Sequence, residues 1–87
     1  MTLADTKRQF QSIVARHHTG MPLDASARAQ ALADLTKDYQ HSMQRIDQFT
    51  AEQRGRRPGF LPINTRIGLV AKLDRLHTAA KADLGLD

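Results

Sequence analysis

The sequence predicts an all-α fold, a three-helix antiparallel bundle with a long central helix. Residues 24–54 contain no proline and no glycine, and their apolar side chains recur at the spacing of one helix face. Shorter segments with helical periodicity flank this stretch, and no short run alternates as a β-strand does. We therefore expect helices at about residues 3–19, 24–54 and 65–84, within one domain that spans residues 1–87.

The first predicted helix begins near Thr2, because Thr2 followed by Asp5 resembles a capping box. It ends before Gly20, which suits the left-handed conformation past a helix end, and Pro22 cannot continue the helix. The residues on its apolar face are Leu3, Phe10, Ile13, Val14 and His17.

The central helix is predicted to start at the N-cap Asp24 and to end at Gly55. The short connection from the first helix makes these two helices antiparallel neighbours. The predicted apolar stripe consists of Leu32, Leu35, Tyr39, Met43, Ile46 and Phe49. Ser42 and Arg28 interrupt the heptad pattern, and glutamines line the opposite face.

The central helix is longer than its neighbours, so the first helix can cover only its N-terminal half. The stripe around Met43, Ile46 and Phe49 is therefore expected to be under-covered. The excess length and the short heptad run also suggest a structural homo-oligomer or homodimer through Tyr39, Met43 and Ile46.

The third predicted helix follows a cap at Asn64 or Thr65 and ends near Gly85. It carries the most regular amphipathic pattern in the chain. The residues on its stripe are Leu69, Val70, Leu73, Leu76, His77, Ala80 and Leu84.

The residue types argue against an enzyme, a metal site and a bound cofactor. There is no cysteine, which excludes disulfides and thiolate ligands. His17 and His18 are adjacent and diverge by about 100° on a helix, whereas His41 and His77 fall on separate helices. No nucleophile elbow or catalytic dyad stands out, and we expect a non-enzymatic protein.

No apolar run could span a bilayer and the first ten residues are too polar for a secretory signal, so we expect a cytoplasmic protein.

The strongest functional signal is a basic segment between the second and third helices. The net charge is +4, and residues 54–87 carry seven lysines and arginines against three acids. Within residues 54–66 there are four arginines, no acid and one aromatic residue, in a stretch that also contains glycines and prolines. The expected partner-binding residues are Arg54, Arg56, Arg57, Phe60 and Arg66. Such a segment favours an acidic surface.

We interpret the chain as a small binding or regulatory protein, resembling an inhibitor or adaptor, that docks through this basic segment on an acidic protein partner. The alternative is a small DNA- or RNA-binding protein that places the same arginines on phosphates. The acidic central helix and the lack of stacking aromatics favour the protein partner.

Overall fold

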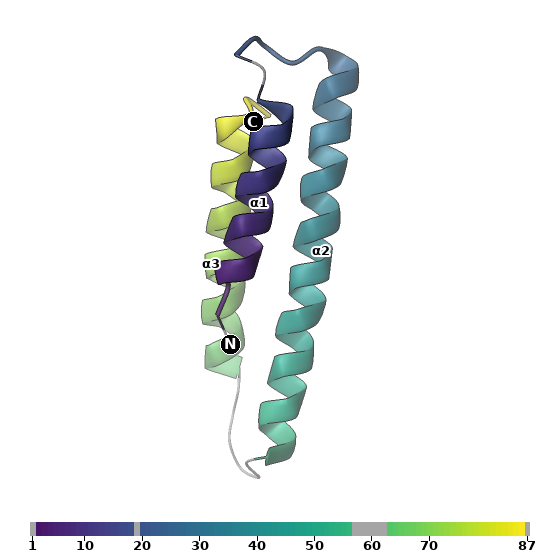
Figure 1. The fold of residues 1–87 in the computed structure, drawn as a ribbon. Helices are drawn as coiled ribbons and strands as arrows, with labels where there is room; N and C mark the ends of the chain where they lie inside the picture. The colour runs from purple at the N-terminus through teal and green to yellow at the C-terminus, as the bar shows by residue number, and fades with distance from the viewer. Residues whose placement is uncertain (1, 19, 57–62, 87) are drawn as a thin grey trace.

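The computed structural model describes residues 2–18, 20–56 and 63–86, and within these it forms three helices and no strand. The helices are α1 (Ala4–His17), α2 (Ala25–Arg56) and α3 (Ile63–Asp83). They lie side by side in an elongated bundle of 52 × 18 × 15 Å, in which α2 runs antiparallel to α1 and α3 (Figure 1). This confirms the predicted all-α, three-helix architecture with its long central helix. Because the chain runs up, down and up, α1 and α3 are parallel to each other.

Three of the predicted helix boundaries have clear structural causes. Asp24 caps α2, since its carboxylate accepts a hydrogen bond of 2.7 Å from the backbone N–H of Ala27. Gly20 and Gly85 adopt left-handed backbone conformations, with φ of 75° and 67°. After α3, the N–H of Leu86 bonds back to the carbonyl of Lys81, which fixes this C-terminal turn.

Three boundary predictions are wrong. Neither Asn64 nor Thr65 caps α3, because the helix begins at Ile63. Thr2 does not cap α1: the N-cap is Leu3, and no side chain makes a cap hydrogen bond. Leu3 is itself buried, so packing rather than capping fixes this end of the helix. Gly55 does not end α2, which continues to Arg56. Glycine permits a left-handed helix end but does not require one, and Gly55 has no positive φ.

The core draws on all three helices. Its largest fully buried side chains are Phe10 of α1, Leu35 and Ile46 of α2, and Leu73 of α3. Partly buried residues that pack against this core include most of the predicted stripes, and among these are Val14, Tyr39, Met43, Phe49, Val70 and Leu76. The periodic apolar residues therefore identified most of the core.

Three residues of α2 differ in burial from what the sequence predicts. Leu32 is 43% exposed, and the neighbouring Ala31 is buried in its place. Ser42 was a defect in the heptad pattern, yet it is buried because a hydroxyl of α1 lies opposite it. Ile46 was expected at an under-covered end, but none of its surface is exposed, because α3 packs along this half of α2 (Figure 1).

Candidate binding groove

The contact between α1 and α2 is fixed by polar side chains as well as by the core. Thr6 and Ser42 share a buried hydrogen bond of 2.9 Å between their hydroxyl oxygens. At the other end of α1, His17 Nε2 lies 2.8 Å from Asp34 Oδ2, and Arg16 lies 3.7 Å from the same oxygen. The hydrogen bond with His17 lowers the pKa of Asp34 below its usual value of 3.8, because it stabilises the carboxylate.

The contact between α2 and α3 is fixed in the same way. The Tyr39 hydroxyl donates a hydrogen bond of 2.6 Å to the Asp74 carboxylate, which together with burial raises the pKa of Tyr39 above 10.0. Nearer the start of α3, Arg66 forms an ion pair of 2.9 Å with Asp47. Both seams of α2 therefore carry specific polar contacts.

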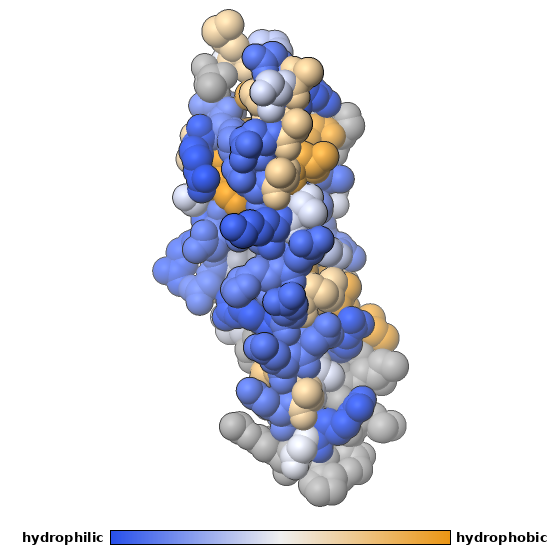
Figure 2. All heavy atoms as spheres, turned by 90° about the vertical axis from the view of Figure 1, so that its right-hand side faces the viewer, coloured by the Kyte–Doolittle hydropathy of each residue, from blue (hydrophilic) through white to orange (hydrophobic). Residues whose placement is uncertain are grey.

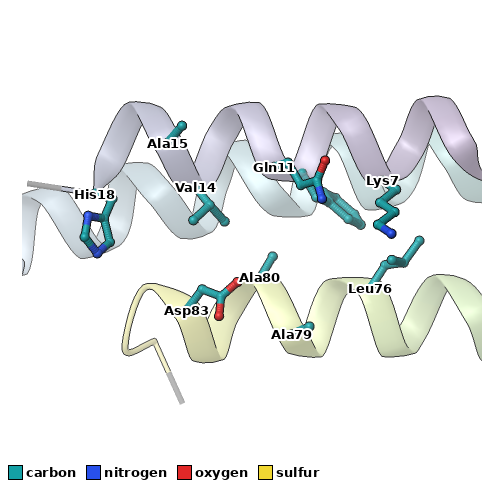
Figure 3. Close-up of a pocket in the computed structure, with 10 residues that line it drawn as sticks. Lys7, Gln11, Val14, Ala15, His18, Leu76, Ala79, Ala80 and Asp83 are labelled. Atoms are coloured by element: carbon teal, nitrogen blue, oxygen red, sulfur yellow. The ribbon is translucent and has the colours of Figure 1, made fainter.

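The seam between α1 and α3 differs. Across it, the described residues make no side-chain hydrogen bond and no ion pair, and the rings of Phe10 and His77 are in contact, with centroids 5.9 Å apart. An open groove of about 520 Å³ runs along this seam. Figure 3 shows Val14 of α1 and Ala80 of α3 directed into the space between the two helices.

The groove has an apolar floor and small residues along its sides. Phe10 and Ala80 are buried, and Val14 and Leu76 are half-buried. The remaining lining residues are exposed and comprise Lys7, Gln11, Ala15, His18, Ala79 and Asp83. The alanines let a neighbouring backbone approach closely, since their side chains are short.

One end of the groove is cationic. A second hollow of about 320 Å³ shares Lys7 and Leu76 with the first and continues it toward the start of α1. Its rim carries Lys7, Lys72 and Arg75, which are exposed and form no ion pair. Three unpaired cations beside an apolar floor favour a ligand with both apolar and anionic groups.

The outward side of α2 provides the contrast. The face of the molecule seen from the right of Figure 1 is mostly hydrophilic, with hydrophobic residues mainly toward its edges (Figure 2). Gln40, Gln44 and Gln48 are exposed along this helix, as the sequence predicted. This face of α2 therefore lacks the open apolar floor of the α1–α3 groove.

His77 is an unusual polar group in the interior. Its ring lies 4.9 Å from that of Tyr39 and contacts Phe10 on the other side, and its buried Nε2 atom has no hydrogen-bond partner. Burial lowers the pKa of His77 below 6.5, and nearby Lys81 lowers it further. The neutral imidazole is therefore the favoured form in the bundle.

The basic segment predicted from the sequence is only partly described. Arg54 is exposed near the end of α2, and Arg66 is in the ion pair with Asp47. Arg56 is the last residue of α2, but its side chain lies outside the described part, as do Arg57 and Phe60 altogether. The assignment of these residues to a binding site stays a prediction.

The residues suggested for self-association have different degrees of burial. Tyr39 and Met43 are half-buried in the bundle, whereas Ile46 is completely buried. A second copy could reach Ile46 only if the helices repacked. Self-association through these residues stays a prediction.

Sequence reasoning missed the groove because its exposed rim residues lie off the main stripes. Lys72 and Arg75 are such residues, since neither is on the apolar stripe predicted for α3. A second stripe of exposed small, polar and charged residues follows helical spacing along each side: residues 4, 7, 11, 15 and 18 on one, and 72, 75, 79 and 83 on the other. Such stripes are visible in the sequence, but only the fold places them opposite each other.

Comparison with known proteins gives no match to a protein family, to a curated protein or to a solved structure. Within the described ranges, no group of three or more His, Cys, Asp or Glu residues could hold a metal ion. None of the three helices, as far as they are described, is long and apolar enough to cross a membrane.

Proposed function

We propose that this chain is a non-enzymatic protein-binding module that docks on an acidic surface of a partner protein through the α1–α3 groove. The observation that carries the proposal is the open apolar seam with the unpaired cations Lys7, Lys72 and Arg75 at one end. Protein interfaces combine an apolar centre with a polar rim in this way. The role is that of an adaptor or inhibitor, which acts by binding.

The apolar floor favours a protein over a nucleic acid. A nucleic-acid site places its cations along a phosphate backbone and adds aromatic residues for stacking. Here the cations flank aliphatic side chains such as Val14 and Leu76, and the aromatic ring of Phe10 is 2% exposed. Burying the aliphatic floor gains free energy only if the partner offers apolar surface as well.

Photo-crosslinking in the native host tests this proposal. A photoreactive residue is placed at Gln11, in the groove, and in a matched control at Gln44, on the exposed side of α2. We expect a protein adduct from position 11 that persists after nuclease treatment and disappears when Lys72→Glu and Arg75→Glu are combined. Adducts from position 44 alone, or loss of the adduct with nuclease, would contradict the proposal.

The basic segment remains a second part of the proposed interface. Reversing Arg54 and Arg56 to Glu should weaken binding of the cross-linked partner without changing helicity, because exposed charges contribute little to folding. If Arg54, Arg56, Arg57 and Arg66 can all be replaced without loss of binding, the partner is held by the groove alone.

A further inference from the structure

We infer that the occupant of the groove is an acidic amphipathic helix of the partner protein, which packs between α1 and α3 as a fourth helix. This inference rests on the proposed function and specifies the partner element. The apolar face of the incoming helix lies on Val14, Leu76 and the buried Phe10 and Ala80 beneath them. Its carboxylates lie at the end that carries Lys7, Lys72 and Arg75.

The shape of the groove fits a helix. α1 has 14 residues, so the seam beside it is about 21 Å long, enough for roughly four helical turns. Packed helices have axes about 8–10 Å apart, which requires small side chains at the closest points. Ala15 and Ala79 supply them on the two sides of the groove.

The cations at one end of the groove determine which charge the incoming helix must carry. Lys7, Lys72 and Arg75 have no ion-pair partner within the bundle, whereas Arg8, Arg16 and Arg66 do. An incoming carboxylate therefore gains a cation without breaking an existing ion pair. At the other end of the groove, the exposed lining residues are His18 and Asp83. That end therefore has no cluster of cations.

A second copy of this chain does not offer a suitable helix. The exposed large hydrophobic residues of the described part are Met21, Leu32 and Ile67, which lie in the first connection, on α2 and on α3. No helix therefore presents a second exposed apolar stripe. Moreover, Asp34 and Asp47 of α2 already have partners within the bundle. The occupant is therefore a different protein.

Binding of a designed peptide by the full chain tests the inference. The probe is an acetylated and amidated helix of about 16 residues, with leucine and alanine on one face and three glutamates flanking one end. A matched peptide carries lysine at the three glutamate positions. Calorimetry gives the affinity, and amide chemical-shift mapping by NMR locates the contact.

We expect the glutamate peptide to bind and to shift amides along α1 and α3. Combining Lys72→Glu with Arg75→Glu should weaken it by about ten-fold. The same variant should bind the lysine peptide better than the native chain does. Ala79→Gln should also weaken binding because the longer side chain enters the groove, whereas Ala82→Gln, at an exposed position that does not line the groove, should not.

Three results would overturn the inference: no binding of the glutamate peptide, equal binding of the two peptides, or shifts confined to α2. If the peptide fails while the host partner still cross-links from position 11, the inference is wrong and the proposed function stands. If neither occurs, both are wrong. In light scattering, a dimer that the peptide cannot dissociate would identify a second copy as the occupant instead.

Discussion

The two seams that α2 makes and the seam between α1 and α3 are built differently. The seams of α2 combine fully buried apolar side chains with polar bonds, such as the buried bond of Thr6 with Ser42 and the exposed bond of Tyr39 with Asp74. The α1–α3 seam has no such bond among the described side chains, and an open groove follows it (Figure 3). One interface holds the bundle together, and the other leaves apolar surface and cations open.

Because of this difference, we expect one set of residues to determine the stability of the bundle and another set to determine its binding. Polar bonds between buried groups fix which residues face each other, because a mispaired hydroxyl or carboxylate loses its partner. A seam that depends on apolar contact has no such requirement and tolerates another helix beside it. We therefore expect substitutions at the α2 seams to change the free energy of unfolding, and substitutions in the groove to change affinity.

The largest expected effect comes from two fully buried leucines, one on α2 and one on α3. Leu35→Ala and Leu73→Ala should each lower the free energy of unfolding by about 2–5 kcal/mol, because both side chains are 0% exposed and leave cavities. Chemical denaturation followed by circular dichroism measures this change. The groove control, Ala79→Gln, should stay within about 0.5 kcal/mol. If the groove variant and the core variants lost equal free energy of unfolding, the groove would be as important for stability as the α2 seams.

These leucines were predictable from the sequence, and their polar neighbours were not. Apolar periodicity finds Leu35, Ile46 and Leu73 because large apolar residues at helical spacing need burial. The same pattern treats Ser42 as a defect, since a buried hydroxyl becomes favourable only once Thr6 lies opposite it. Leu32 keeps the spacing yet remains exposed, because Ala31 lies closer to the core.

The groove could not be predicted for a related reason. Lys7 is 65 residues from Lys72, so nothing local in the sequence connects them. Their proximity follows from the parallel arrangement of α1 and α3, which depends on both connections and on the length of α2. The sequence did indicate cationic character in its C-terminal third, but assigned it to residues 54–66.

The next largest effect concerns the buried hydroxyl pair. Ser42→Ala should cost about 1–3 kcal/mol because the Thr6 hydroxyl is then buried without its partner. Thr6→Val should cost less, since the Ser42 hydroxyl can turn to the backbone carbonyl one helical turn earlier. The double variant should cost less than the sum of the two single changes. Additive losses in this cycle would show that the bond does not stabilise the seam.

The smallest expected effect is a pH dependence caused by His77. The pKa of this histidine is lowered in the bundle from the value of 6.5 that the unfolded chain has, because its ring is buried between Phe10 and Tyr39. As the pH falls below 6.5, the unfolded chain takes up the proton first. The free energy of unfolding should therefore decrease from pH 6.5 down to the lowered pKa and then stop changing on account of His77.

His77→Phe isolates this contribution, because it keeps an aromatic ring and removes the titrating group. The titratable groups that act on His77 are Asp74 and Lys81 on α3, and Tyr39 faces it from α2. Denaturation curves collected across mildly acidic pH should decline more steeply for the native chain than for the variant. Asp34 acts in a separate window: its pKa is lowered from 3.8, so its contribution is present above that value and is lost as the pH falls further. Parallel curves for the native chain and the variant as the pH falls from 6.5 would contradict a buried Nε2 atom of His77 without a hydrogen-bond partner.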